Sequence, residues 1–236
     1  MNAKITLSIG VSAIIFITLA LLANAHTPLL SGPNLLQNDD FETWASTTIT
    51  YATLFDGLPQ FLQTDTVSLP QGWAPELVFS CCVFPELGNV VSQGEPNTGT
   101  FGLKLGGFSG DPLATGVYFT QDVPVVPGFS YKAAYHVKNP FPGDPNARRM
   151  RGTWKDTNGS PISSAFFLPA PATTTYTHVE GSAGFAPCNA TSIRVYLDKA
   201  DFGGITYDDA YFGEDLTVPP FDCDDIEDEE DDEEEE

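Results

Sequence analysis

The chain of 236 residues carries ten Lys and Arg against 32 Asp and Glu, a formal net charge of −22 at pH 7. This charge excludes nucleic acid as a partner, because affinity for the phosphate backbone comes from Lys and Arg. Aromatic residues are 12% of the chain, Gly, Pro and Thr are frequent, and no long segment has the helical period of 3.6. The composition therefore indicates an all-β protein.

The N-terminal residues 1–25 are predicted to be a secretory signal peptide. Lys4 supplies a short basic region, an apolar run follows, and Ala23-Asn24-Ala25 has the small-x-small pattern of a cleavage site. An uncleaved membrane anchor is the alternative, because the apolar run is close to spanning length. We expect a secreted or cell-surface protein that has no membrane contact after cleavage and begins with a loose leader at 26–33.

The first half of the mature chain is predicted to contain short strands and one irregular stretch. A short strand at 34–44 runs into a polar corner, and 48–55 has strand character. Residues 56–72 contain too many turn residues for a regular element. Strand character returns at 73–84 and again at 100–106.

The middle of the chain has the clearest strand pattern. In the segment 129–139, alternation places Tyr131, Ala133, Tyr135 and Val137 on one face and Lys132, Ala134, His136 and Lys138 on the other. The sequence Asp-Thr-Asn-Gly at 156–159 predicts a hairpin turn. Further strands are expected at 116–126, 173–185, 190–200 and 205–214. Eight to ten short strands without intervening helices predict an antiparallel β-sandwich.

The C-terminal segment 215–236 is predicted to be a disordered acidic tail. Thirteen of its last fifteen residues are Asp or Glu, which leaves nineteen acids against ten bases in the rest of the chain. Such a block repels itself and cannot bury a core. It could solubilise the protein, collect calcium weakly, or dock on a basic patch of the same or a neighbouring chain.

The four cysteines are expected to form disulfides, because an exported chain meets an oxidising environment. We expect Cys188 to bond to Cys81 or Cys82. Cys223 lies beyond the predicted domain, so it could pair back to the body or with another chain. No cysteine spacing typical of a zinc site is present.

Four segments, in this order, resemble jelly-roll carbohydrate-binding modules with a galactose-binding-like fold. They are "NLLQNDDFE" (34–42), "LPQGW" (69–73), "FTQDVPVVPGFSYKAAYHVK" (119–138) and "IRVYLDKADFGGITYDDAYFGE" (193–214). The chain departs from that pattern at Asp39, where the family usually has Gly, in the long stretch 45–68, and in the acidic tail. The resemblance implies that the sandwich is a jelly roll over residues 34–214, and that it is a non-catalytic module that binds a glycan.

The resemblance also implies a structural calcium ion near the ends of the domain. Alternation in the last strand places Asp208 on the same face as Ala210 and Phe212, and the family pattern implies that this face points inward. A buried carboxylate needs a cation or hydrogen-bond donors. Carried over from the family, the calcium ligands are Glu42 and Asp208, with Asp40 or Asp209 as further candidates. Calcium suits carboxylate oxygens. Alternatively, these acids cap backbone N–H groups at a corner of the sheet.

Sugar recognition needs an aromatic platform beside polar groups. Trp73 is predicted to pack in the core, whereas Trp44 and Trp154 are candidate platforms that could equally be packing residues. Six of the ten bases lie between residues 132 and 155. Four residues of this region, His136, Lys138, Arg149 and Arg151, could therefore bind an anionic ligand such as a uronate or sulfate. The alternative is an ordinary solvated sheet face.

Two functions remain open at this point. The first is a secreted carbohydrate-binding module, and the second is a calcium-dependent structural protein that assembles into oligomers or filaments outside the cell. We do not expect an enzyme, because the chain has only three His and lacks the Gly-x-Ser-x-Gly nucleophile motif.

Overall fold

The computed structural model describes residues 31–55, 58–78, 91–106, 116–141, 147–199 and 203–224. These residues form twelve β-strands, and they contain no α-helix. Accordingly, none of the described segments is an apolar helix of the length needed to span a bilayer. The prediction of an all-β chain is confirmed.

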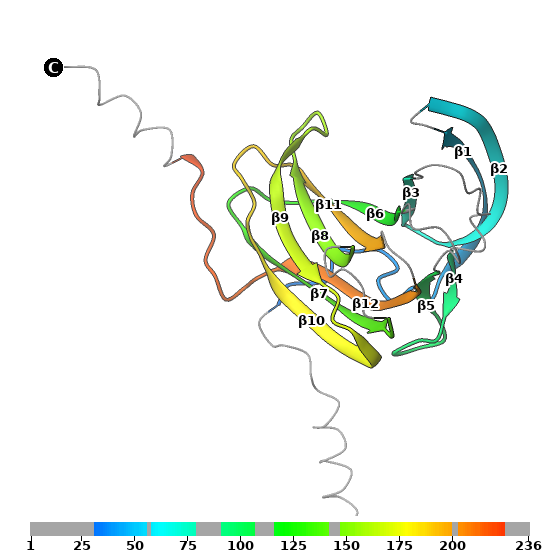
Figure 1. Cartoon of the computed structure of the whole chain (residues 1–236). Helices are drawn as coiled ribbons and strands as arrows, with labels where there is room; N and C mark the ends of the chain where they lie inside the picture. The colour runs from blue at the N-terminus through cyan, green and yellow to red at the C-terminus, as the bar shows by residue number, and fades with distance from the viewer. Residues whose placement is uncertain are drawn as a thin grey trace, which may run out of the picture. The chain divides into compact units, whose positions relative to one another are not determined.

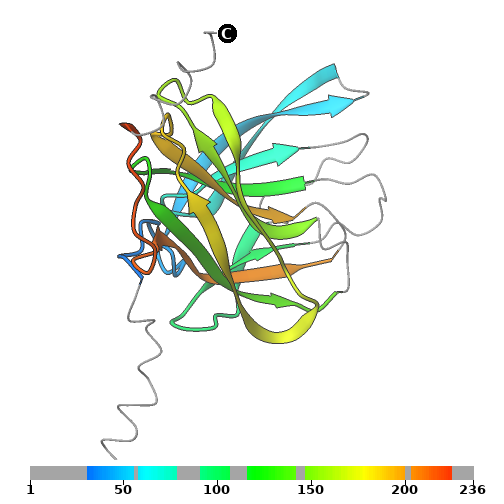
Figure 2. The same cartoon turned by 90° about the vertical axis from the view of Figure 1, so that its left-hand side faces the viewer.

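Ten of the strands form two five-stranded antiparallel sheets (Figures 1 and 2). The first, called here the β7 sheet, has the order β10 (Thr173–Phe185), β7 (Ser130–Asn139), β12 (Ile205–Glu214), β5 (Gly102–Leu105) and β4 (Val91–Gly94). The second, the β8 sheet, has the order β3 (Ala74–Val78), β6 (Gly116–Pro124), β11 (Ser192–Lys199), β8 (Arg148–Lys155) and β9 (Pro161–Pro169). From β5 onward the chain passes repeatedly from one sheet to the other, which produces the predicted sandwich.

The core lies between the two sheets and follows the alternation of the strands. In β7 the side chains of Tyr131, Ala133, Tyr135 and Val137 are at most 1% exposed, as the sequence predicts. Residues on β8, β11 and β12 complete this layer, and the ring of Tyr131 stacks on that of Phe212 at 5.2 Å. Burial of such apolar area is the main stabilising contribution to the fold. The intervening residues point away from the core and form two outer faces.

A long hairpin of β1 (Trp44–Phe55) and β2 (Leu58–Pro70) forms a separate two-stranded sheet. The prediction that 56–72 contains no regular element is therefore wrong. Paired threonines support the hairpin, since the hydroxyls of Thr48 and Thr66 lie 3.2 Å apart and those of Thr50 and Thr64 lie 2.9 Å apart. The two prolines of β2 lie at its ends, where a strand tolerates them.

The turn between β8 and β9 is the one predicted at 156–159. The carboxylate of Asp156 accepts N–H groups from Asn158 and Ser160, each at 2.8 Å, and Gly159 has a φ of 76°. A positive φ favours glycine, so the Asn-Gly sequence specifies this connection.

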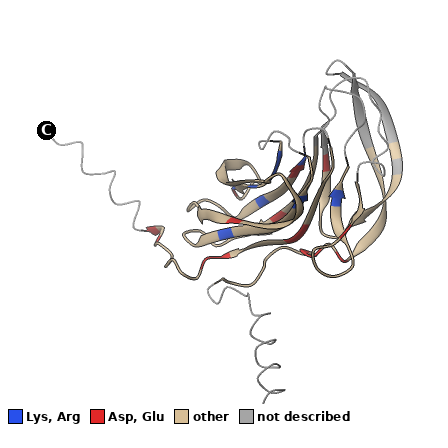
Figure 3. Ribbon diagram, turned by 60° about the horizontal axis from the view of Figure 1, so that its bottom comes forward, with Lys and Arg blue, Asp and Glu red and all other residues tan. Residues whose placement is uncertain are grey.

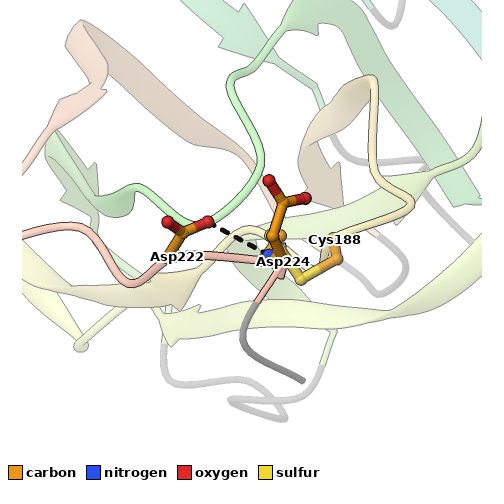
Figure 4. The surroundings of a disulfide bond; sticks show 4 residues. Cys188, Asp222 and Asp224 are labelled. Carbon is orange, nitrogen blue, oxygen red and sulfur yellow. Dashed lines mark hydrogen bonds between the residues drawn. A yellow bond between two sulfur atoms is a disulfide. The ribbon is translucent and has the colours of Figure 1, made fainter. Parts of the chain in front are cut away.

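The segment 215–224, predicted as the start of the disordered tail, instead lies against the body. Cys223 forms a disulfide with Cys188, and the Cα atoms of the two residues lie 5.5 Å apart (Figure 4). The N–H of Phe221 donates to the carbonyl of Gly128 at 3.0 Å, and the ring of Phe221 packs on that of Phe185 at 5.2 Å. A Cβ on Gly128 would lie 2.4 Å from the Phe221 carbonyl oxygen, so this close approach requires glycine.

The disulfide corrects one cysteine prediction and confirms another. Cys188 does not bond to Cys81 or Cys82, because it is already bonded to Cys223. The return of Cys223 to the body is confirmed. Cys81 and Cys82 lie outside the described residues.

The other boundary of the module also shifts. Gly32, which was predicted to belong to the leader, donates its N–H to the carbonyl of Glu214 at 2.9 Å.

Candidate functional site

The outer face of the β8 sheet carries a group of aromatic and charged side chains on four neighbouring strands. The strand register places Arg151 opposite both Tyr196 and Phe167, and Asp198 opposite both Arg149 and Tyr118. We call these six residues the aromatic–arginine cluster: Tyr118, Arg149, Arg151, Phe167, Tyr196 and Asp198. They reach this face because each strand alternates them with buried residues of the core.

Asp198 lies at the centre of the cluster. Its side chain is 1% exposed, and its Oδ2 accepts hydrogen bonds from Nε of Arg149 at 2.9 Å and Nε of Arg151 at 2.6 Å. Burial raises the pKa of Asp198, and the two guanidinium groups oppose that rise. Its Oδ1 is buried and has no hydrogen-bond partner among the described residues. A buried oxygen of this kind is costly unless a donor reaches it.

Aromatic rings surround the two arginines. The guanidinium carbon of Arg151 lies 3.6 Å from the ring centre of Tyr196 and 5.7 Å from that of Tyr118. The guanidinium carbon of Arg149 lies 4.7 Å from the ring centre of Phe167, whose side chain is 44% exposed. Burial raises the pKa of Tyr118, so its hydroxyl keeps its proton. Cation–π contacts therefore fix the guanidinium planes beside solvent-accessible ring surface.

A second ion-paired group flanks the cluster on the same sheet. Arg194 donates two hydrogen bonds to the carboxylate of Asp122, at 2.8 and 2.6 Å, and Nζ of Lys155 lies 3.5 Å from it. The hydrogen bond from Arg194 lowers the pKa of Asp122. Acidic partners therefore offset the bases of this face, and Figure 3 shows basic and acidic residues interspersed on the strands.

The four predicted anion-binding residues do not share a surface. Arg149 and Arg151 lie on the outer face of the β8 sheet, whereas His136 and Lys138 lie on the outer face of the β7 sheet. The prediction of one joint patch is wrong because the chain crosses from one sheet to the other between β7 and β8. On its own face, Lys138 binds Glu95 at 2.6 Å.

His136 lies beside other titratable groups on that face. Its Nδ1 is 3.5 Å from Asp209, and its ring centre is 4.9 Å from that of His178. Burial lowers the pKa of His136 and thus favours the neutral imidazole.

The tryptophans do not form a sugar platform on the cluster. Trp154 is 2% exposed and packs edge-on against Tyr131, with ring centres 5.8 Å apart, so its prediction as a ligand-binding residue is wrong. Trp73 is 4% exposed and packs against Phe41, which confirms the predicted packing role. Trp44 packs against the core with its indole N–H donating to the Phe41 carbonyl at 2.5 Å.

The sequence reading missed the aromatic residues that do face outward. Tyr118, Phe167 and Tyr196 each stand between two apolar residues of a strand. In the segments Val-Tyr-Phe, Phe-Phe-Leu and Val-Tyr-Leu, the alternation that buries the flanking residues exposes the central ring. That pattern could have identified the three rings.

The acids predicted to bind calcium lie at the other outer face, where a bulge reorients them. Asp209 has a φ of 46°, and the register of β12 against β7 shifts between Asp208 and Tyr211. Asp208 is opposite His136 on the outer face, whereas Phe212 is opposite Ala133 in the core. The prediction that Asp208 and Phe212 share a face is therefore wrong, because a β-bulge reverses the alternation.

Asp208 is nevertheless fully buried, because the segment Asn97–Phe101 covers it. Its Oδ2 accepts the backbone N–H groups of Asn97 at 2.6 Å and Thr98 at 3.2 Å. Burial raises the pKa of Asp208 to about 6.

Glu42 binds the same segment, and Asp40 does not. Oε1 of Glu42 accepts the N–H groups of Thr100 at 2.5 Å and Phe101 at 2.9 Å, and these bonds lower the pKa of Glu42. Among the described residues, the side chain of Asp40 accepts only the N–H of Glu42, within its own turn, at 3.2 Å.

These contacts do not fit a calcium site. Calcium takes six to eight oxygen ligands. Within the described part of the chain, no group of three or more His, Cys, Asp and Glu side chains is placed to hold a metal ion. The carboxylate oxygens instead accept N–H groups, which corresponds to the alternative that the acids cap the backbone at a sheet corner.

Comparisons with known proteins give structural similarity only. No protein-family model matches the sequence, and no curated protein matches it. A solved structure of the enzymatically active domain of tailspike protein 4 from bacteriophage CBA120 shares 14% identity, with a TM-score of 0.44. The match covers 77% of this chain and 21% of the tailspike chain.

Carbohydrate-binding modules are also among the similar structures. The C-terminal family 22 module of Clostridium thermocellum Xyn10B shares 15% identity over 63% of this chain and 90% of the module, with a TM-score of 0.39. TmCBM61, solved in complex with β-1,4-galactotriose, shares 12% identity over 78% of this chain and 99% of that module, with a TM-score of 0.38. All of these scores lie below 0.5.

Proposed function

We propose that this protein is a non-catalytic carbohydrate-binding protein that holds a glycan on the outer face of its β8 sheet. The observation that carries the proposal is the buried Oδ1 of Asp198, which has no hydrogen-bond partner among the described residues. It belongs to a carboxylate bound by two arginines, and those arginines contact three aromatic rings. We propose that the side chains covering this oxygen move apart when the ligand binds, so that a sugar hydroxyl can donate to it.

The chemistry of the aromatic–arginine cluster suits a sugar ring. The apolar face of a pyranose packs on an aromatic ring, and Tyr196 and Phe167 provide rings beside the guanidinium groups that touch them. Asp198 would accept one hydroxyl while the arginines donate to sugar oxygens. Because the bases of this face are paired with Asp198 and Asp122, we propose a ligand bound mainly through hydroxyl groups rather than through negative charge.

We further propose that the cluster binds and does not catalyse, and that the protein works outside the cell. Two acids of this face, Asp122 and Asp198, are held by arginines, and no His or Cys belongs to the cluster. The disulfide between Cys188 and Cys223 supports export, because such bonds persist in oxidising compartments.

The test is a glycan array with the full chain, followed by titration calorimetry on the best glycan. Tyr196→Ala should weaken binding by about tenfold, which is the loss expected for one aromatic contact. Asp198→Asn should weaken it further, because the amide N–H group is a donor and would face either the donating arginine N–H groups or the donating sugar hydroxyl.

Trp44→Ala is the matched control for the array and the calorimetry, since Trp44 is a large aromatic residue away from the cluster. It should leave the affinity unchanged. Loss of binding in Trp44→Ala but not in Tyr196→Ala would contradict the proposal. Assembly triggered by calcium without any glycan binding would favour the alternative of a structural surface protein.

A further inference from the structure

The segment Asn97–Phe101, here called the strap, crosses the outer face of the β7 sheet between β4 and β5. Residues from several elements hold it. Just before the strap, Lys138 of β7 binds the side chain of Glu95, and the hydroxyl of Tyr176 of β10 donates to the Glu95 carbonyl. The strap itself is bound by Asp208 and Asp209 of β12 and by Glu42, which precedes β1.

The strap presents donors to these acids. Four of its five backbone N–H groups point to a carboxylate, and only that of Gly99 does not. The side chains of Asn97 and Thr98 add hydrogen bonds to Asp209 at 2.9 and 2.7 Å. Successive N–H groups make a concave anion-binding surface of partial positive charge. A cation at this corner would require the backbone to offer carbonyl oxygens instead.

Gly99 shows that the sequence is matched to this arrangement. It has a φ of 67°, a conformation that favours glycine, and a Cβ there would lie 2.1 Å from Oε1 of Glu42. A side chain at this position would displace the carboxylate that binds Thr100 and Phe101. Glycine therefore allows both the turn of the strap and the approach of Glu42.

We propose that this corner is closed without a metal ion, by a clasp in which Glu42 and Asp208 bind backbone N–H groups of the strap and Asp209 binds its Asn97 and Thr98 side chains. The clasp takes the place of the calcium that the resemblance to carbohydrate-binding modules implies. It holds the polar corner at Glu42, the strap and the last strand together, and it offsets the cost of burying the Asp208 carboxylate.

The direct test is amide hydrogen exchange of the full chain in calcium and in EGTA. The acidic tail can collect calcium by itself, so bulk binding is not a useful readout and the local amides are. The N–H groups of Asn97, Thr98, Thr100 and Phe101 should exchange slowly and at equal rates in both buffers. Protection of these amides that appears only in calcium would overturn the proposal.

Variants provide a second measurement by thermal unfolding with and without EDTA. Asp208→Asn should lower the melting temperature by about 6 °C, because one charge-assisted acceptor is lost in a domain of this size. Glu42→Gln should lower it less, and Asp40→Asn, the matched control that does not touch the strap, should not change it. EDTA should shift none of these values.

The calcium hypothesis and the metal-free clasp predict opposite effects of EDTA on the same proteins. If calcium binds at this corner, EDTA lowers the melting temperature of the wild type to that of Glu42→Gln and has no effect on the variant, and the clasp is wrong. If Asp208→Asn does not fold, Glu42→Gln and the exchange measurement still decide between the two.

Discussion

The two outer faces of the sandwich each bury one carboxylate, and they satisfy it in different ways. On the β8 sheet, Asp198 is bound by two arginine side chains and retains one oxygen without a partner among the described residues. On the β7 sheet, Asp208 is bound by backbone N–H groups on both of its oxygens. The first arrangement leaves one carboxylate oxygen without a partner, and the second gives both oxygens a partner.

The side chains and backbone that surround Asp198 and Asp208 also differ. Aromatic rings, among them the exposed ring of Phe167, lie beside the arginines that bind Asp198, whereas a strap of main chain covers Asp208. A buried charge is therefore not by itself a sign of a functional site, since it can equally hold two segments of chain together. The unsatisfied oxygen and the exposed rings distinguish the binding face from the structural one.

The largest expected effect comes from removing the central acid of the binding face. Asp198→Ala should reduce the free energy of unfolding by about 4 kcal/mol, because it leaves two arginines without their shared buried partner. Glycan binding should be lost at the same time. Urea unfolding and calorimetry measure the two effects.

Asp122→Ala is the control for Asp198→Ala on the same sheet. The side chain of Asp122 is 45% exposed, so its loss should cost less than about 1 kcal/mol. An equal cost for the two variants would mean that Asp198 behaves as an ordinary surface acid, and the contrast between the faces would then fail.

The next largest effect is expected from removing the disulfide, which should lower the stability of the whole domain and affect both outer faces equally. Replacing Cys188 and Cys223 together by Ser removes a bond that spans 35 residues, which should cost about 3 kcal/mol. Glycan affinity and the exchange protection of the strap should both persist well below the new melting temperature. A selective loss at one face would show that the disulfide shapes that face rather than stabilising the whole domain.

Strand alternation explains how much of this fold could be read from the sequence. The two faces of β7 and the turn at 156–159 follow from local rules, so both are confirmed. The predicted faces of β12 were wrong after Asp208, because a bulge at that point changes the alternation. The bulge has no glycine that would mark it in the sequence. The hairpin of β1 and β2 was missed because its prolines obscured the pairing of its threonines.

The candidate site was predicted less well, and for a reason of topology. Arg149 and Arg151, predicted as anion-binding residues, lie on the outer face of one strand, but their partner Asp198 is distant in sequence and joins them only through strand pairing. Trp154 was chosen for its size, although its alternation with Arg151 and Lys155 already placed it on the inward face. Contacts between strands of a sheet depend on which strands are neighbours and in which register they pair, and alternation within a single strand does not reveal either.

The pH dependence of stability gives a smaller effect on the binding face. Because burial raises the pKa of Asp198 above its value in the unfolded chain, the folded state binds the proton more tightly. The stabilisation from this group is complete below the unfolded pKa and is lost as the pH rises through the folded pKa. The stability advantage of the wild type over Asp198→Asn should thus shrink as the pH rises above the ordinary range of an Asp side chain.

A bound sugar should weaken this pH dependence, because a hydroxyl that donates to Oδ1 stabilises the ionised carboxylate. Urea unfolding at several pH values, with and without the best glycan, measures the change. The same slope in both series would show that the ligand does not reach Asp198.

The smallest expected effect is on the structural face, in Lys138→Ala. Lys138 and Glu95 form an ion pair in which the Glu95 side chain is 74% exposed, so the melting temperature should fall by less than about 2 °C. Glycan affinity should not change, because Lys138 lies on the β7 sheet and the cluster lies on the other. A clear loss of affinity in Lys138→Ala, with Tyr196→Ala unaffected, would reverse the assignment of the faces. The surface of His136 and Lys138 would then be the binding site, and the arginines that hold Asp198 would serve only the fold.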